Sequence, residues 1–313
     1  MALDKRGDVA AAEIVIYIPI LVISFILVVR HGFARTAGWI FLVILSIIRI
    51  VGGVTHVLSE TSDKNNSTLI TIYSIMESAG LSPLLMATLG FCNTVAQNSV
   101  DSHPLMSRGT HLMGLLGTLA LVLSIIGGVK MGVAKTESDL HSASTLRHVG
   151  SILFLVLFVA TFFVHVFLWN NRGRILKYRR QLLAGISAAL PFLFIRVLYS
   201  VLGSFAPLSE SIDANGKVTH TTNNSFLSNF SITGSWVIYV VMSVLMEYIA
   251  ILIYVIVGIK TPLQNDYLQS PLAERWDEDS AESAKLQPYA MQQPYAQSQP
   301  SYAQGQGYAA PYE

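Results

Sequence analysis

Seven long runs of apolar residues follow one another between the N-terminus and Gly258. Each run has about the 20 residues that an α-helix needs to cross the hydrocarbon core of a bilayer, or more. Helices are expected because, in hydrocarbon, every backbone amide must find its hydrogen-bond partner within its own segment. The predicted helices are Ala10–Val29, Thr36–Leu58, Thr68–Ala96, Gly109–Val129, Leu146–Trp169, Gln181–Phe205 and Phe230–Gly258. The predicted fold is therefore all-α: a polytopic membrane protein whose seven-transmembrane-helix bundle occupies residues 1–259.

Composition supports a membrane protein and argues against some other classes. Of the 313 residues, 52% are hydrophobic and 12% are charged, whereas soluble domains carry about 25% charged residues. A formal net charge of +1 gives no reason to expect a nucleic-acid partner. Cys92 is the one cysteine, so no disulfide forms within the chain.

The last segment, residues 260–313, has a different composition. An acidic patch, Trp276-Asp277-Glu278-Asp279, precedes a run rich in Gln, Pro, Tyr and Ala. Such a composition cannot bury a core, which predicts a disordered tail. Two roles stay open for this tail: a docking segment for a cytoplasmic partner, or a solvated tether without a specific partner.

Basic residues indicate which side of the membrane each loop faces. The loop from Arg30 to Arg35 is basic at both ends, and the loop from Asn170 to Arg180 contains no acidic residue. The basic residues of the second of these loops are Arg172, Arg174, Lys177, Arg179 and Arg180. Positively charged loops stay in the cytoplasm, which places both loops and the tail inside. The fourth loop weakens this pattern with Lys130, Lys135 and Arg147.

Glycosylation signals agree with this orientation. Asn-x-Ser/Thr acceptor patterns occur in the second and sixth loops, at Asn65, Asn66, Asn223 and Asn229. These loops have the opposite parity to the basic ones, so the N-terminus is predicted outside and the C-terminus in the cytoplasm. Trp39 and Trp169 are expected at the inner membrane interface and Trp236 at the outer one. The predicted protein is a glycoprotein of the plasma membrane or of a secretory-pathway membrane.

Four ionisable residues lie well inside the predicted helices: Arg49, Glu77, Arg196 and Glu247. Each one costs at least about 2.5 kcal/mol at the centre of a bilayer. At a rise of 1.5 Å per residue, the first three lie roughly 13 Å below the outer boundary and Glu247 about 15–20 Å below it. Two positive and two negative charges in one layer predict a network.

Two interpretations of this network stay open. In the first, Arg49–Glu77 and Arg196–Glu247 are buried ion pairs that hold neighbouring helices together. In the second, the four residues line a water-filled cavity in the outer half of the bundle, where they bind a polar ligand or relay protons.

The sequence gives little support for a haem site, a zinc site or a rhodopsin-like receptor. His111 and His165 fall near the inner ends of the fourth and fifth helices, where one haem could lie between them. Interfacial histidines bonded to backbone or water explain them better. Intramembrane zinc hydrolases need clustered histidines and carboxylates, and the seventh helix has no histidine. We therefore expect no metal, no cofactor and no enzymatic activity. The chain also lacks the Asp-Arg-Tyr and Asn-Pro-x-x-Tyr motifs of rhodopsin-like receptors.

Several short segments along the membrane region have a distinctive sequence: Arg30-His31-Gly32-Phe33, Gly38-Trp39-Ile40-Phe41, Ser46-Ile47-Ile48-Arg49-Ile50-Val51-Gly52, Gly80-Leu81-Ser82-Pro83-Leu84-Leu85, Leu190-Pro191-Phe192, Ile195-Arg196-Val197-Leu198-Tyr199-Ser200, Met246-Glu247 and Ile253-Tyr254. In these segments the chain resembles an uncharacterised family of fungal integral membrane proteins, which is known only as a domain of unknown function. The resemblance extends over the membrane region, from Met1 to about Gly258. The resemblance implies seven helices and a fungal source, and it brings no activity.

Three functions remain, from different classes. An odd number of helices, an outside N-terminus and a cytoplasmic tail favour a receptor-like or sensory protein, by analogy of layout alone. The alternative is a transporter or lipid-translocating protein, and the third is a structural scaffold. A transporter needs a central site that both sides can reach, whereas a receptor needs a pocket open outward. The expected partners are membrane lipids and a small-molecule or lipid ligand.

Overall fold

The computed structural model describes residues 4–31, 38–61, 67–97, 99–100, 103, 105–207, 210–212, 218–220, 226–231 and 234–261. Within this part of the chain, seven helical segments are long and apolar enough to cross a membrane. The predicted all-α fold with seven such helices is therefore confirmed. Three of the predicted glycosylation sites, Asn65, Asn66 and Asn223, and the tail beyond Thr261 lie outside the described residues.

The described elements follow the order of the predicted helices, with short helical and strand segments between them. The longer helices are α1 (Lys5–His31), α2 (Trp39–Thr61), α3 (Ser67–Ala79), α4 (Leu81–Ala96), α5 (Thr110–Gly132), α6 (Glu137–Asn170), α7 (Lys177–Ser204) and α9 (Met246–Lys260). The shorter helical segments are η2 (Leu105–Gly109), η3 (Arg172–Arg174), η4 (Phe226–Phe230), α8 (Trp236–Tyr239) and η5 (Val240–Leu245). Between α7 and η4, β1 (Glu210–Ile212) pairs antiparallel with β2 (Val218–His220), and Ser211 lies opposite Thr219.

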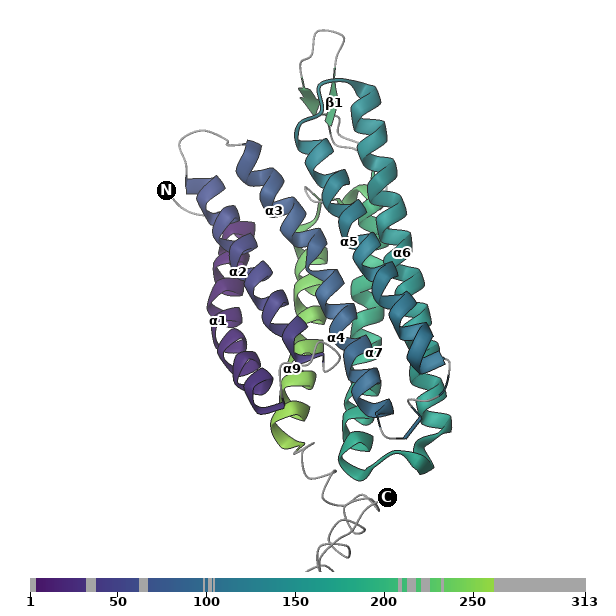
Figure 1. Ribbon diagram of the computed structural model, residues 1–313. Helices are drawn as coiled ribbons and strands as arrows, with labels where there is room; N and C mark the ends of the chain where they lie inside the picture. Colours follow the sequence, from purple (N-terminus) through teal and green to yellow (C-terminus); the bar gives the residue numbers. More distant parts are fainter. Residues whose placement is uncertain are drawn as a thin grey trace, which may run out of the picture. The chain divides into compact units, whose positions relative to one another are not determined.

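The helices run up and down in one bundle (Figure 1). The main pairs are α1 with α2, α5 with α6, and α7 with α9, and α4 lies among them in contact with α2, α5, α6 and α7. Every residue of α4 except Met86 and Asn93 is buried, as expected for a helix surrounded by others. We call the end at which α1 begins the N-terminal end, and the end at which α9 finishes the C-terminal end.

Large apolar side chains cover the outside of the bundle. Val15 is 70% exposed, Phe25 54%, Leu115 68% and Phe163 65%. A water-soluble surface rarely carries this many large apolar side chains close together, whereas lipid accepts them without cost. The arrangement therefore suits a multi-pass membrane protein.

Helix α6 and the third span differ most clearly from the predicted helices. Helix α6 begins at Glu137, nine residues before Leu146, because Thr136 and Asp139 form a capping box there. Its 34 residues extend about 50 Å, which exceeds the roughly 30 Å of hydrocarbon. The third span is interrupted at Gly80, close to Pro83, whose ring nitrogen cannot donate to the preceding helical turn.

Packed apolar side chains fill the C-terminal end of the bundle. Trp39 is 0% exposed and lies against Phe91, with 4.6 Å between ring centroids, and Phe91 in turn lies 4.8 Å from Tyr254. Gly258 makes room for this cluster, since a Cβ there would come within 2.4 Å of the Trp39 ring. The prediction that Trp39 belongs to an interfacial aromatic belt is wrong, because its ring lies in the core. Thr88 adds a buried hydrogen bond of 2.8 Å to the Tyr254 hydroxyl.

Candidate functional site

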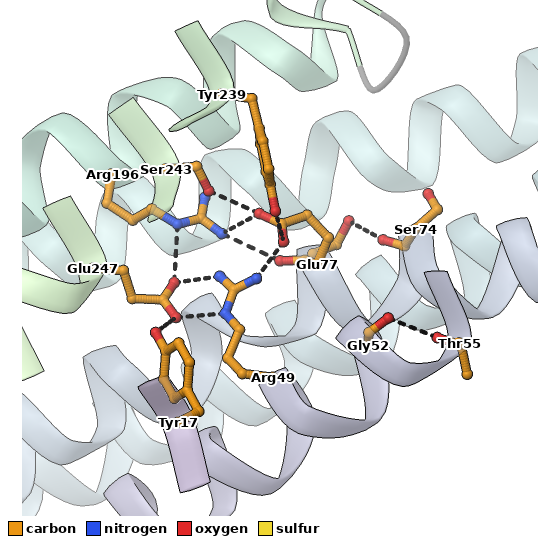
Figure 2. Close-up of polar contacts among 11 residues, drawn as sticks. Tyr17, Arg49, Gly52, Thr55, Ser74, Glu77, Arg196, Tyr239, Ser243 and Glu247 are labelled. Atoms are coloured by element: carbon orange, nitrogen blue, oxygen red, sulfur yellow. Dashed lines mark hydrogen bonds and ion pairs between the residues drawn. The ribbon is translucent and has the colours of Figure 1, made fainter. Parts of the chain in front are cut away.

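The four intramembrane charges come together in the middle of the bundle (Figure 2). Arg49 comes from α2, Glu77 from α3, Arg196 from α7 and Glu247 from α9. The side chain of Glu77 is 12% exposed, and the other three are between 0% and 4% exposed. The four residues that the sequence singled out therefore contact one another, and we call them the charge cluster.

Each arginine of the charge cluster contacts both glutamates. Arg49 binds Glu247 through two nitrogens, with 2.5 Å from Nε to Oε1, and it also contacts Glu77. Arg196 donates from Nε to Glu247 Oε2 and from Nη2 to Glu77 Oε1, each at 3.2 Å. The predicted pairs Arg49–Glu77 and Arg196–Glu247 both exist, but they are two sides of a closed ring. The two-pronged contact, which is the stronger kind, joins Arg49 to Glu247.

Neutral donors complete the charge cluster. Tyr17 from α1 donates to Glu247 Oε1 at 2.9 Å. Tyr239 and Ser243 donate to the two oxygens of Glu77 at 3.0 and 2.8 Å. Each of the four carboxylate oxygens thus accepts two hydrogen bonds, which is the full capacity of an ionised carboxylate. The charge cluster is saturated, and a ligand would have to break an existing contact to bind these carboxylates.

Local backbone structure brings these side chains together. A Cβ at Gly80 would lie 3.3 Å from the Arg49 guanidinium, so the glycine lets that group lie against the helix backbone. The last span contains a π-helical segment, η5, on which Ser243 lies between Tyr239 and Glu247. π-Helical turns are rare and occur often at functional sites. Here the wider turn accompanies three side chains, four residues apart, that all reach the charge cluster.

Glu13 is a fifth buried ionisable residue that sequence reasoning missed. It lies on α1, is 4% exposed, and its Oε1 is buried without a hydrogen-bond partner in the described part of the chain. It borders a small space that Arg49, Tyr73 and Glu77 also line. The predicted first helix began at Ala10, so Glu13 seemed to lie near its end. The observed α1 begins at Lys5, which places Glu13 two turns inside.

A cavity lies on the N-terminal side of the charge cluster. The empty space between its lining residues, together with the open solvent at its mouth, is about 670 Å³. Glu77 and Arg196 form its floor, α3, α5, α6 and α7 form its walls, and residues of α1, η4 and α8 lie around it. Five serines line the cavity: Ser78, Ser124, Ser151, Ser200 and Ser204. The second interpretation of the four charges expects a cavity that they line, and two of the four, Glu77 and Arg196, line this one.

Two further arginines line the cavity, and neither was among the predicted site residues. Arg147 seemed to belong to the fourth loop, but it lies on α6 because that helix begins before it. Its Nη1 lies 3.2 Å from the sulfur of Met131. Arg6, in the first turns of α1, donates to the carbonyl oxygen of Gly234 at 2.5 Å and lies over the ring of Tyr239.

The remaining predicted sites do not join this region. His165 is 5% exposed and hydrogen-bonds Ser187 at 3.0 Å, while His111 is exposed. In the described residues, no three His, Cys, Asp or Glu side chains are grouped in a way that would hold a metal ion. Asn229, the one described glycosylation candidate, is exposed on η4, as a modified asparagine must be.

Comparison with known proteins gives a family and no activity. One family model, described as a domain of unknown function (DUF7702), matches residues 3–264. That range contains every described helix and the whole charge cluster. No curated protein matches the chain, and no solved structure does.

Proposed function

The chain belongs to the family DUF7702, and we propose that it is a receptor-like membrane protein that binds a ligand from the side on which its N-terminus lies. The observation that carries the proposal is the polar cavity above the charge cluster, which is lined by three arginines and five serines. Ligand pockets of proteins carry a small number of convergent polar groups that fix the orientation of the ligand. This proposal assigns no catalytic step to the chain.

We expect the charge cluster to hold the base of this cavity rigid. Its hydrogen bonds connect residues of α1, α2, α3, α7, α8, η5 and α9. Movement of any of these segments would change contacts made by Glu77 or Glu247. A ligand above Glu77 and Arg196 is therefore in contact with the group that links most of the bundle, as a signalling receptor requires.

The filled C-terminal end favours a receptor over a transporter. Trp39, Phe91 and Tyr254 are each 0% exposed, and Leu84 and Ile186 beside them are also fully buried. Alternating access requires a route from the central site to both sides. In this conformation packed side chains occupy the C-terminal route.

The orientation and location are part of the proposal. The basic loop around Arg172 would face the cytoplasm, and the cavity and the exposed Asn229 would face the outside or the lumen of the secretory pathway. The membrane would be the plasma membrane or a secretory-pathway membrane. Membrane lipids and a small ligand would be the partners, and the tail is a candidate to bind a cytoplasmic partner.

Cysteine accessibility in sealed vesicles of both orientations tests the proposal. Ser200→Cys places a thiol in the cavity wall, and a negatively charged, membrane-impermeant thiol reagent reports access to it. We expect labelling only when the N-terminal side faces the reagent. An antibody against an N-terminal tag identifies that side.

Two controls make the result specific. Wild-type chain contains only Cys92, which is 0% exposed and should stay unlabelled. Ala189→Cys, at a fully buried position of α7, should stay unlabelled from either side. Labelling of Ser200→Cys from both sides would support the transporter instead, and labelling from neither side would exclude an open cavity.

A further inference from the structure

The cavity lining carries more positive than negative charge. Arg6, Arg147 and Arg196 line it together with one carboxylate, Glu77, so its formal charge is +2. Arg196 and Glu77 belong to the charge cluster, whose two arginines and two glutamates balance one another. The positive excess therefore comes from Arg6 and Arg147.

Arg147 has no ionic partner in the described part of the chain, because no carboxylate there lies within 4.0 Å of its guanidinium. Its one polar contact with a described residue is to the sulfur of Met131 at 3.2 Å, and a thioether is a weak acceptor. A partly buried arginine without a counter-ion destabilises a folded protein, so a purely structural role leaves its presence unexplained.

Helix packing places Arg147 at the cavity. A Cβ at Gly127 of α5 would come within 2.9 Å of Arg147 Cγ, so the missing side chain leaves room for the arginine stem to cross α5. The side chain is thereby held between α5 and α6, and it lines the cavity rather than reaching the end of the bundle. Such confinement preorganises a binding group before any ligand arrives.

Hydroxyl groups beside these arginines are available to a ligand. Ser124, Tyr199 and Ser200 line the cavity, and no hydrogen bond to another described residue uses their side-chain oxygens. Hydroxyls donate readily to anionic oxygens. The planar guanidinium fits carboxylate and phosphate oxygens, because its parallel N–H groups match their geometry.

We propose that the cavity binds an oxyanion, a carboxylate or phosphate group, with Arg147 as its main charged partner and Arg6 as a second one. This assignment rests on the proposed function, since it names the ligand class of the same cavity. A soluble small molecule and the headgroup of an anionic lipid both carry this chemistry. The charge cluster below stays intact, because the anion meets Arg147 and Arg6 rather than the saturated carboxylates.

Thermal unfolding of the purified full chain tests the assignment. In detergent, inorganic phosphate and acetate are compared with chloride at equal ionic strength. In nanodiscs, phosphatidylcholine alone is compared with phosphatidylcholine containing phosphatidic acid. We expect an oxyanion or the phosphatidic acid to raise the melting temperature of the wild-type chain, and Arg147→Gln to weaken the apparent affinity by about tenfold or more.

Matched variants separate this site from general charge effects. Arg174→Gln removes an exposed arginine at the C-terminal end and should leave the response unchanged. Arg147→Gln should also melt at a higher temperature than wild type when no anion is present, because it removes an uncompensated charge. Arg6→Gln should weaken the response less than Arg147→Gln.

Each outcome of this experiment either identifies the source of the oxyanion, a soluble molecule or a lipid headgroup, or overturns the assignment. Stabilisation by phosphate or acetate indicates a soluble ligand, and stabilisation by phosphatidic acid alone indicates a lipid headgroup. An absent response, or one that Arg147→Gln leaves unchanged, overturns the oxyanion site. If Ser200→Cys is still labelled from the N-terminal side in that case, the receptor proposal stands and only the ligand class is wrong.

Discussion

At the scale of single residues, the charge cluster shows how four ions can be buried in a bundle. Every oxygen of Glu77 and Glu247 accepts two hydrogen bonds. Removing one member of such a group leaves its partners charged and buried, which costs about 3–5 kcal/mol. The energetic importance of each residue therefore depends on which partner it leaves behind.

Arg49→Ala is expected to lower the free energy of unfolding by about 3–5 kcal/mol. A second substitution, Glu247→Ala or Glu77→Ala, should restore part of this loss. Glu247→Ala should restore more, because Arg49 contacts Glu247 through two nitrogens and Glu77 through one. Melting temperature and folded yield of the single and double variants measure the effect. A double variant no better than Arg49→Ala would show that the contacts are not coupled.

Glu13→Gln should behave in the opposite way to substitutions in the charge cluster. The substitution keeps the shape of the side chain, removes no ion pair between described residues, and replaces a buried carboxyl group that has an unsatisfied oxygen with a neutral amide. We expect the melting temperature to stay level or rise. Glu77→Gln, measured in parallel, should lower it. Equal losses in both variants would mean that Glu13 has a charged partner in the folded protein.

The sequence predicted part of this residue-scale picture. The four charges of the cluster stood out because each lies at the centre of an apolar run. Their cross-linked contacts could not be predicted, since pairing depends on how α2, α3, α7 and α9 meet. Glu13 and Arg147 were missed because each lies near a predicted helix end that the structure moves.

At the scale of helices, close packing depends on small residues. A Cβ at Gly53 would come within 3.1 Å of the Ala10 carbonyl oxygen, and one at Gly127 within 3.1 Å of the Ala143 carbonyl oxygen. These glycines let α1 approach α2 and α5 approach α6, as small residues do between membrane helices. The neighbouring glycines also lie close to another helix, since a Cβ at Gly52 would come within 3.1 Å of Met76 and one at Gly128 within 2.7 Å of Ile75.

Gly127→Ala is expected to destabilise the protein by about 1–3 kcal/mol, because the added methyl meets backbone as well as the Arg147 stem. Gly114→Ala on the same helix is the matched control. A Cβ there meets only Met86 at 3.7 Å, an ordinary contact, so helix propensity should leave it neutral or slightly stabilising. Equal melting temperatures for the two variants would contradict the packing of α5 against α6.

Helix boundaries were harder to predict than helix positions. The start of α6 depends on the capping box of Thr136 and Asp139, which lies outside the apolar run. The break at Gly80 lies close to Pro83, and the Arg49 guanidinium of another helix lies against it, 3.3 Å from the position of a Cβ. Hydropathy records which residues meet lipid or core, and it does not record capping or contacts between helices.

At the scale of the whole molecule, seven spanning helices followed directly from the length of the apolar runs. The cavity did not, because its walls come from polar residues on four helices that the sequence spaces widely: Tyr73, Ser124, Arg147 and Tyr199. Orientation and the role of the tail remain predictions of charge and composition.

Truncation tests whether the described bundle is sufficient for membrane insertion. A chain that ends after Thr261 should still resist extraction by alkaline carbonate, because all seven spanning helices end by Lys260. A chain that ends at Ser235 loses the last span and Glu247, and it should fold poorly. Loss of insertion in the longer variant would show that the tail contributes to the membrane domain.

A cryo-EM map of the full chain, purified from its native membrane, would show the charge cluster and the cavity together. We expect a closed ring of Arg49, Glu77, Arg196 and Glu247, with non-protein density in the cavity beside Arg147. We also expect packed side chains between the charge cluster and the C-terminal end. A cavity filled by protein side chains, or a continuous passage to the C-terminal end, would contradict these expectations.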